Sequence, residues 1–332
     1  MSTRPTISVV VCTHNRAGFL RQALDSLAGQ TLARGRYEVI VVNNGSTDET
    51  VAAVRACQKN QQCAVRLVEE PALGLGRARN TGWEAAAGAY VAFMDDDARA
   101  DAGWLERALA LFEHSRPTPI AVGGQIRPWY VSGKAGWYKD EYEVRSWGPE
   151  PRRLSVGESF SGSNMIFAKT ILQQTGGFDA GMGMRGTRIA MGEETVLFNE
   201  IWRRLGDQAV LLYAPDLIVY HAVTAAKMRV RYHLSRWFVA GQIATRLDPP
   251  LSFHDRLSRL RAGITAIRGL MRSALDQRSL FPDYRSWMVE RLGPVALEIG
   301  RFLAGMGLHM RVRRPAVTDQ PQNGRSRQWS FR

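Results

Sequence analysis

Three adjacent aspartates, Asp95, Asp96 and Asp97, stand directly after an apolar run that ends at Met94. Adjacent carboxylates repel one another and raise each other's pKa, so holding them at the end of a buried strand costs stability unless a cation or hydrogen-bond donors offset the repulsion. Oxygen ligands suit Mg²⁺ or Mn²⁺, which often share their remaining positions with substrate phosphates. The alternative is a solvated acidic turn that opens the next helix. The triplet alone leaves both interpretations open.

A second acidic pair, Glu193 and Glu194, precedes a strongly helical pattern at residues 196–205. Adjacent glutamates at the start of a helix often only complement the helix dipole. Further along, His221 ends an apolar run, and a lone histidine is more often structural than functional. The order of these groups after the aspartate triplet favours a site in which a separate carboxylate faces a bound cation.

The elements that must position these groups are short apolar strands alternating with helices. Runs rich in β-branched residues occupy 7–12, 37–42, 65–68 and 89–93, and helical patterns lie between them. This alternation predicts an α/β fold with a mostly parallel sheet covered by helices on both faces. Ligands of such sheets bind at the carboxyl ends of the strands, where the polar clusters of this chain fall.

The glycine pattern excludes two common nucleotide folds. Gly74 and Gly76 do not follow the first strand, and the loop after that strand, residues 13–16, contains no glycine, so a dinucleotide-binding fingerprint is absent. The chain also has no glycine-rich loop with a Walker lysine.

Composition and charge divide the chain near residue 222. Hydrophobic residues make up 45% and charged residues 23%, which are values of a globular protein. The net charge of +13 arises entirely in residues 222–332, because acidic and basic residues balance in 1–221. We therefore expect a catalytic domain at 1–221, a basic amphipathic helical region at 222–314 and a flexible polar tail at 315–332.

The basic region contains an amphipathic helical pattern followed by a second apolar stretch at about 287–310, which charged residues interrupt too often for a membrane span. The apolar residues of the first pattern are Phe253, Leu257, Leu260, Ile264, Ile267, Met271 and Leu275, with arginines at 256, 259, 261, 268 and 272 between them. Two interpretations stay open: the helices pack on the catalytic domain, or they dock on anionic lipid. Nucleic acid is not expected as a partner, since no recognition module is visible.

The segment at 128–158 is rich in tryptophan and tyrosine, which either pack over a substrate ring or anchor a long connection. The three cysteines lack metal-ligand spacing, and residues 1–6 lack the apolar core of a secretory signal. We expect a cytoplasmic location.

Taken together, these segments resemble the inverting family 2 glycosyltransferases of the GT-A type. The matching segments, in order, are 8–16, 41–48, 78–82, 95–97, 162–164, 176–179, 192–194 and His221. The resemblance implies transfer of a sugar from a nucleotide-diphosphate donor to an acceptor hydroxyl, with a divalent metal (Mn²⁺ or Mg²⁺) as cofactor. It also implies a glycan or lipid-linked acceptor, which could be met at an anionic membrane surface on the inner face of the cell membrane.

The resemblance also implies roles for single residues. Thr13, Asn15 and Asn44 would hold the nucleobase and ribose, Asp95 or Asp96 would contact the ribose, and Arg79 would contact the donor. Asp97 and His221 would bind the metal. Glu194 aligns with the catalytic base that removes the proton of the acceptor hydroxyl.

Two features differ from the usual family pattern. The family more often has Glu-Asp where this chain has Glu193-Glu194, and often has Asp where Asn43 and Asn44 stand, so the donor base is left open. Two alternative functions were weighed: a sugar-nucleotide nucleotidyltransferase, which should carry a basic, glycine-rich triphosphate loop after the first strand, and a catalytically silent donor-binding or lipid-docking scaffold.

Overall fold

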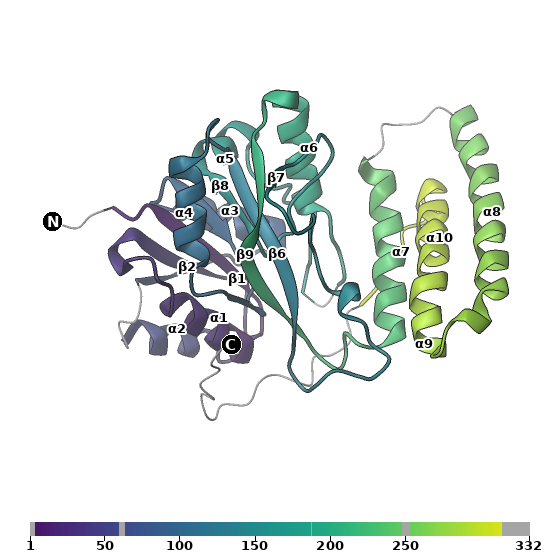
Figure 1. The fold of residues 1–332 in the computed structure, drawn as a ribbon, viewed down its shortest axis with the longest axis horizontal. Helices are drawn as coiled ribbons and strands as arrows, with labels where there is room; N and C mark the ends of the chain where they lie inside the picture. Colours follow the sequence, from purple (N-terminus) through teal and green to yellow (C-terminus); the bar gives the residue numbers. More distant parts are fainter. Residues whose placement is uncertain (1–3, 60–63, 187, 248–252, 314–332) are drawn as a thin grey trace.

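A mixed β-sheet with helices on both faces forms one part of the molecule, and a separate group of helices stands beside it (Figure 1). The computed structural model describes residues 4–59, 64–186, 188–247 and 253–313. Within these ranges the strand order is β3-β2-β1-β4-β8-β6-β9-β5, and β7 pairs with β9. The predicted α/β class with a C-terminal helical region is confirmed.

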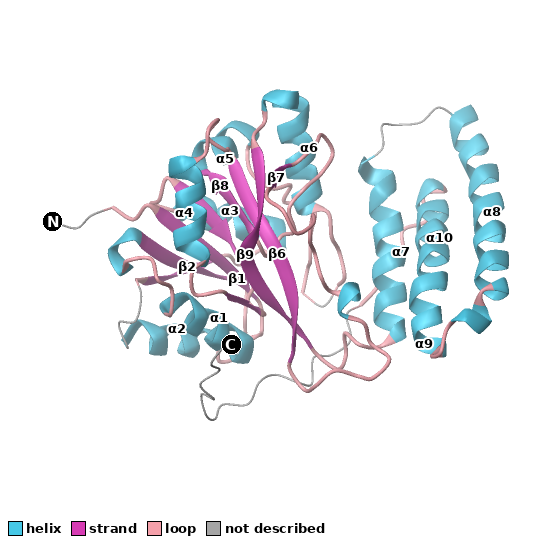
Figure 2. Cartoon of the chain, in the orientation of Figure 1, coloured by secondary structure: helices cyan, strands magenta, loops and turns pink. Residues whose placement is uncertain are grey.

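The first half of the sheet is parallel, as its alternation with helices predicts. It consists of β1 (Ile7–Thr13), β2 (Tyr37–Asn43), β3 (Val65–Glu69) and β4 (Tyr90–Phe93), joined by α1 (Ala17–Ala28), α2 (Thr50–Lys59) and α3 (Leu75–Ala85). Every residue of β2 is buried, as expected for a strand covered on both faces. Figure 2 shows helices in front of and behind the sheet.

The second half of the sheet mixes both strand directions. The strands are β5 (Ala98–Ala100), β6 (Ala121–Tyr130), β7 (Arg152–Arg153), β8 (Met165–Ala168) and β9 (Leu211–Val223). Strand β8 runs antiparallel to β4 and β6, β6 and β9 are parallel, and β5 and β7 are antiparallel to β9. The parallel pairing that dominates the predicted sheet therefore holds for β1 to β4 and for β6 with β9, while antiparallel pairs join the remaining strands.

Two apolar layers hold the helices against the sheet. Helix α1 and α4 (Trp104–His114) pack on one face through side chains such as Leu24 and Trp104. Helices α3, α5 (Lys169–Thr175) and α6 (Glu193–Leu205) pack on the other face. Short 3-10 turns lie at Arg34–Arg36, Asp140–Tyr142, Gly206–Gln208 and Arg278–Leu280. The carboxyl ends of β1, β2 and β4 are left uncovered for a site.

Asn164, in the segment that precedes β8, ties three elements together. Its fully buried amide donates from Nδ2 to the backbone oxygens of Gln125 and Leu217, both at 2.8 Å, and its Oδ1 accepts from Nε1 of Trp104 at 2.9 Å. One side chain thus satisfies polar groups of β6, β9 and α4.

Replacing Asn164 with Ala is expected to lower the free energy of unfolding by about 3 kcal/mol, because it leaves a buried indole N–H and two carbonyl groups without partners. Urea denaturation followed by circular dichroism measures the change. Asn199→Ala, at an exposed position of α6, is the matched control. Equal midpoints for the two variants would contradict the structural role.

The C-terminal helices form their own layer. Helix α10 (Gly293–Gly305) lies between α7 (Val230–Leu247) and α8 (Phe253–Asp276), with α9 (Tyr284–Trp287) and a π-helical turn (Met288–Leu292) at one end (Figure 1). Gly241 and Gly300 allow α7 and α10 to touch, since a Cβ at either would lie about 2 Å from a carbonyl oxygen of the other helix. No helix in the described ranges is long and apolar enough to cross a membrane.

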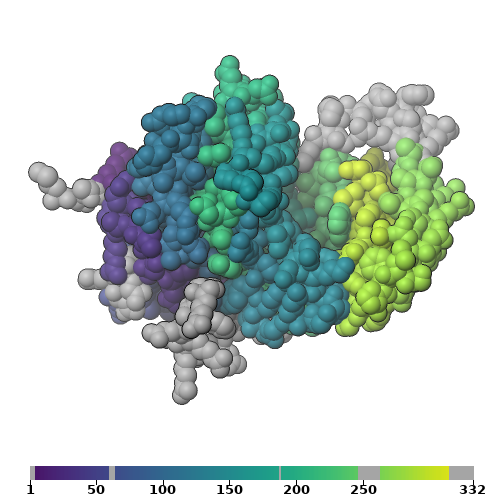
Figure 3. Space-filling model, viewed as in Figure 1, coloured from purple at the N-terminus to yellow at the C-terminus, as the bar shows by residue number. Residues whose placement is uncertain are grey.

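The aromatic segment at 128–158 connects the two parts of the molecule, which meet in the lower half of Figure 3. Tyr138 is buried with Val223 and Met228, and its hydroxyl lies 2.8 Å from Nε2 of His233 on α7. Tyr142 donates to Glu290 at 2.7 Å. For these tyrosines the structure supports the anchoring interpretation rather than a cover over the substrate.

The predicted domain boundaries stay predictions. Strand β9 continues to Val223, past the predicted boundary at residue 221. The side chains of residues 246–261, including Phe253, Leu257 and Leu260 of the predicted apolar face, lie outside the described part, as does the predicted tail at 315–332.

Candidate active site

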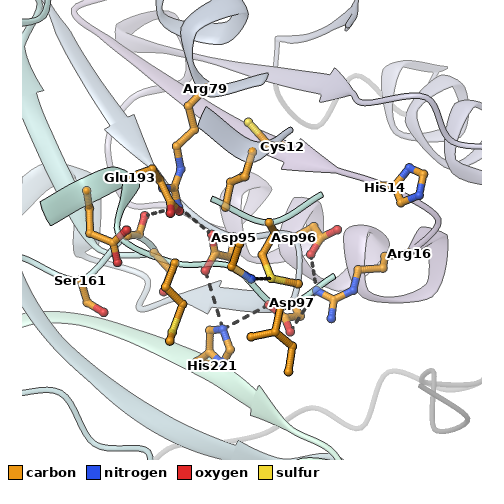
Figure 4. A pocket seen from close by; sticks show the side chains of 18 of the residues that line it. Cys12, His14, Arg16, Arg79, Asp95, Asp96, Asp97, Ser161, Glu193 and His221 are labelled. Carbon is orange, nitrogen blue, oxygen red and sulfur yellow. Dashed lines mark hydrogen bonds and ion pairs between the residues drawn. The ribbon is translucent and has the colours of Figure 1, made fainter. Parts of the chain in front are cut away.

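A cavity of about 310 Å³ opens at the carboxyl ends of β1, β2 and β4 (Figure 4). Among the predicted site residues that line this cavity, Thr13 and His221 are 208 positions apart in the sequence. The cavity is lined by Thr13, Asn44, Arg79, Asp95, Asp96, Asp97, Glu194 and His221. Asn15 is not among the described lining residues.

Asp95, Asp97 and His221 form the one cluster in the described residues with the composition and spacing of a metal site: one ligand atom from each lies within 4.8 Å of the others. Nε2 of His221 lies 3.2 Å from Oδ1 of Asp97 and 3.7 Å from Oδ2 of Asp95. The sheet explains this meeting, because β5 follows the triplet and pairs Ala98 directly with His221 of β9. Two carboxylates and an imidazole fit Mn²⁺ well and Mg²⁺ acceptably.

Arg16 and Thr13 stabilise the two buried aspartates. Thr13 Oγ1 donates to Asp96 Oδ2 at 2.8 Å, and Arg16 Nη1 donates to Asp96 Oδ1 at 2.8 Å and lies 3.1 Å from Asp97 Oδ2. Burial raises the pKa of Asp96, and Arg16 only partly opposes it. Burial also raises the pKa of Asp97. The positive charges of Arg16, His221 and Lys227 outweigh this effect and hold its pKa well below the ordinary value. Asp97 is therefore ionised at neutral pH.

Lys227 is a second cation at this cluster, and it was not among the residues predicted from the sequence. It lies in the connection between β9 and α7, is 4% exposed, and its Nζ is 3.1 Å from Asp97 Oδ2 and 3.2 Å from His221 Nδ1. It also donates to the backbone oxygen of Ala222 at 2.7 Å. The sequence offered one hint of its role, its position six residues after the candidate metal ligand His221.

Arg79 connects the two acidic clusters, as Figure 4 shows. The buried guanidinium donates from Nη1 to Glu193 Oε1 at 2.8 Å and from Nη2 to Asp95 Oδ1 at 3.3 Å. It also contacts the backbone oxygen of Gly162 at 3.3 Å. These contacts fix the position of α6, and therefore of Glu194, relative to the aspartate triplet.

The two glutamates at the start of α6 differ in environment. Both line the cavity, but Glu193 is 4% exposed and faces Arg79, whereas Glu194 is partly exposed. Oε2 of each glutamate is buried and has no hydrogen-bond partner in the part of the chain that the structure describes, but Oε1 of Glu193 accepts from Arg79, whereas no such ion pair holds Glu194. A carboxylate oxygen placed in this way is available to accept a proton from a ligand.

Burial, and next the charge of Glu194, raise the pKa of Glu193 from 4.5 to about 8. Because the folded protein holds this proton more tightly than the unfolded chain, the contribution of Glu193 to the unfolding free energy falls as pH rises above about 4.5 and levels off above about 8. The slope is at most about 1.4 kcal/mol per pH unit.

Glu193→Gln is accordingly expected to flatten the pH dependence of stability between pH 5 and 8, since Gln mimics the protonated carboxyl group. Urea unfolding at several pH values measures this. Glu84→Gln, on the exposed side of α3, serves as the control. A wild-type slope retained in Glu193→Gln would rule out the assignment.

The two predicted asparagines have structural bonds. Asn44 donates from Nδ2 to the backbone oxygens of Glu70 and Ala72 and accepts from Gly74 N at 2.9 Å. Asn15 has a positive φ of 54° and accepts from Thr47 N at 2.7 Å. Their amides shape the loops around the cavity, and their direct contact with a donor stays a prediction. His14, which the sequence analysis passed over, lines the cavity beside them.

An α/β sheet with helices on both faces and an acidic cavity at its strand ends is the arrangement of GT-A glycosyltransferases. The profile described as "Glycosyl transferase family 2" matches residues 8–174, half of the chain. The chain belongs to this family. Membership of this family sets aside the nucleotidyltransferase alternative, whereas a catalytically silent scaffold stays an alternative.

Curated relatives are similar over part of their length. Glycosyltransferase AglE of Haloferax volcanii is 34% identical over 170 residues, which cover 51% of this chain and 52% of the relative. Glucosyl-dolichyl phosphate glucuronosyltransferase of the same organism is 25% identical over 212 residues, 61% of this chain and 66% of the relative. The chain thus spans between half and two thirds of the length of these relatives.

Solved structures share the fold over nearly the whole chain. Mannosyltransferase PcManGT from Pyrobaculum calidifontis, in complex with GDP-Man and Mn²⁺, superposes with a TM-score of 0.60 at 20% identity and covers 90% of this chain and 87% of its own. S. aureus TarS 1–349 in complex with UDP-GlcNAc has a TM-score of 0.53 at 16% identity, covering 92% and 93%. Both likenesses include the C-terminal helical region in their coverage.

Proposed function

We propose that the protein is an inverting, metal-dependent glycosyltransferase that moves a sugar from a nucleoside-diphosphate donor to an acceptor hydroxyl. The observation that carries this proposal is the convergence of Asp95, Asp97 and His221 with Glu194 on one cavity. In this proposal the metal-type cluster would act on the leaving diphosphate and Glu194 on the acceptor within the same cavity. The donors named with the structural neighbours, GDP-Man and UDP-GlcNAc, belong to the proposed donor class.

The donor set of the cavity fits a divalent cation. Asp95, Asp97 and His221 would hold it, and the cation, when bound, stabilises the negative charge that develops on the leaving diphosphate. Arg16 and Lys227 keep Asp97 ionised and oriented. Thr13 and Asp96 would meet the ribose, and Arg79 holds Asp95 toward the donor.

Glu194 is proposed as the base. Its unpartnered oxygen would accept the proton of the acceptor hydroxyl as that oxygen attacks the anomeric carbon on the side opposite the diphosphate. Attack from the opposite side inverts the configuration at this carbon. Arg79, through Glu193, fixes the start of α6 and so the position of the base.

A thermal-shift screen of nucleotide sugars with and without Mn²⁺ or Mg²⁺ tests the proposal, because a ligand that binds only the folded protein raises Tm. We expect one nucleotide sugar to raise Tm in a metal-dependent way and a free nucleoside diphosphate to act similarly. No metal-dependent shift with any sugar nucleotide would argue against the proposed donor class.

We also propose a lipid-linked acceptor, met at an anionic membrane surface on the cytoplasmic side. One similar protein is named for transfer to a glucosyl-dolichyl phosphate. In this chain α8 exposes Ile264, Met271 and Leu275, with 41%, 38% and 60% of their surface accessible, beside the exposed Arg268 and Arg272. Apolar and basic side chains on one exposed helix are suited to the headgroup region of an anionic bilayer.

The protein is expected to co-sediment with vesicles that contain phosphatidylglycerol more than with pure phosphatidylcholine vesicles. Arg268→Glu combined with Arg272→Glu should reduce the bound fraction several-fold, since each basic residue near the surface contributes about 1 kcal/mol. Arg55→Glu with Lys59→Glu, on exposed positions of α2, makes the same charge change elsewhere. Equal binding by both double variants would count against docking through α8.

A further inference from the structure

One wall of the cavity carries two arginines and a single carboxylate. Arg145, Arg236 and Glu143 all line the cavity, together with Tyr232. Arg145 is held by a backbone bridge to Ile126 of β6, with N···O distances of 2.9 and 3.0 Å in the two directions. Arg236 comes from α7 of the C-terminal helical region. The wall is therefore built by segments other than those that carry the predicted donor site.

Glu143 does not balance both guanidinium groups. It is 7% exposed, its Oε2 lies 3.7 Å from Arg236 Nη1, and its Oε1 accepts from the hydroxyl of Tyr138 at 2.7 Å. Burial lowers the pKa of the neighbouring His233 to about 4, so this histidine is neutral and adds no charge at neutral pH.

Arg145 has no carboxylate within ion-pair distance in the described ranges. Its Nη1 donates to the backbone oxygens of Tyr142 and Val144, at 3.2 and 2.9 Å. Burial and the nearby charge of Arg236 both disfavour the charged form and lower the pKa of Arg145. A guanidinium stays charged in proteins, and a partly buried one without a carboxylate partner is unfavourable.

The other carboxylates of the cavity are engaged elsewhere. Asp96 and Asp97 face Arg16, and Glu193 faces Arg79. Glu194 is left for the acceptor hydroxyl. In the described part of the chain, Glu143 is therefore the single carboxylate beside two guanidinium groups, so this wall carries an excess positive charge that a ligand can balance. Paired guanidinium groups suit the oxygens of a phosphoryl group.

We infer that Arg145 and Arg236 form a subsite for a phosphoryl group that is part of the acceptor. This inference rests on the proposed transferase function and specifies its substrate class: a phosphorylated acceptor rather than a neutral glycan. The donor diphosphate is the competing source of phosphate, but its proposed place is at the metal-type cluster of Asp95, Asp97 and His221. Arg236 instead lies on α7, in the same C-terminal helical region in which α8 exposes apolar and basic side chains.

Calorimetric titration with farnesyl phosphate tests the subsite, with farnesol as the same chain without the phosphate. Both probes are titrated into the full-length protein, with and without saturating Mn²⁺ and a nucleoside diphosphate (GDP or UDP). We expect saturable binding of farnesyl phosphate and at least 10-fold weaker binding of farnesol. Arg145→Gln and Arg236→Gln should each weaken farnesyl phosphate at least 10-fold and leave nucleotide affinity within 2-fold. Arg236→Lys should recover part of the loss.

Arg127→Gln is the matched control, because Arg127 is an exposed arginine of β6 near Arg145 that does not line the cavity. Equal affinity of farnesol and farnesyl phosphate, or wild-type binding by both Gln variants, would overturn the subsite. So would a loss of nucleotide affinity in those variants, which would assign the arginines to the donor.

Failure of the proposed function itself would appear differently, as absence of metal-dependent nucleotide binding in the wild-type protein. Should Arg145→Gln fail to fold, Arg236→Gln and Arg236→Lys decide the matter alone.

Discussion

Glu194→Gln is expected to lower turnover by at least about 100-fold while leaving donor affinity nearly unchanged, because Gln keeps the shape of the side chain but cannot take a proton. Both glutamates line the cavity and each has an unpartnered carboxylate oxygen, but Glu193 is buried and bound to Arg79, whereas Glu194 is partly exposed and has no ion pair in the described ranges. Steady-state kinetics with the nucleotide sugar found in the thermal-shift screen measures turnover, and calorimetry measures donor affinity.

Glu193→Gln is the matched variant for this experiment, since it changes the adjacent carboxylate on the same helix. Its effect on turnover should be much smaller than that of Glu194→Gln. Near-normal turnover in Glu194→Gln, or a larger loss in Glu193→Gln, would remove Glu194 from the role of base.

Asp97→Ala is expected to abolish metal-dependent donor binding. Asp97 is the carboxylate that faces His221 at 3.2 Å and is kept ionised by two cations, so its removal takes away a ligand and half of the anionic charge in the cluster with Asp95. Calorimetric titration of the nucleotide sugar with and without Mn²⁺ measures the donor side, and Mn²⁺ paramagnetic resonance measures the metal side directly.

The same substitution leaves Arg16 and Lys227 without their shared partner, so a lower Tm is expected in Asp97→Ala. Asp97→Asn retains the size of the side chain and separates loss of charge from loss of packing. Asp207→Asn, at an exposed position after α6, is the control. Unchanged donor affinity and Mn²⁺ binding in both Asp97 variants would refute the metal assignment.

Local sequence patterns predicted the first half of the fold because that half is built from local units. Each β-branched run at 7–12, 37–42 and 89–93 became a strand of the parallel half, and the polar residues after them meet at one edge. The mixed half was less predictable. Strand β5 has three residues, and its pairing with β9 joins segments more than 100 positions apart, so no local periodicity marks it.

Site residues that form a short cluster of like charges could be predicted from the sequence. Single site residues contributed by elements far apart in the sequence could not. The aspartate triplet and Glu194 are marked by clustered charge. Lys227, Arg145 and Arg236 stand among many basic residues, and only tertiary packing brings these three to the cavity. Helical periodicity alone also does not show that Glu193 binds Arg79 while Glu194 has no ion pair in the described ranges, and only the resemblance singled out Glu194.

The two cations beside Asp97 have a consequence for how the protein matures. Arg16 and Lys227 already neutralise the most acidic part of the cavity from within the chain. We therefore expect newly synthesised protein to fold without capturing an ion, unlike small domains whose assembly waits for zinc. Under the proposed metal dependence, chelation would lower activity reversibly without unfolding the protein, and a fluctuating metal supply would regulate its output rather than its abundance.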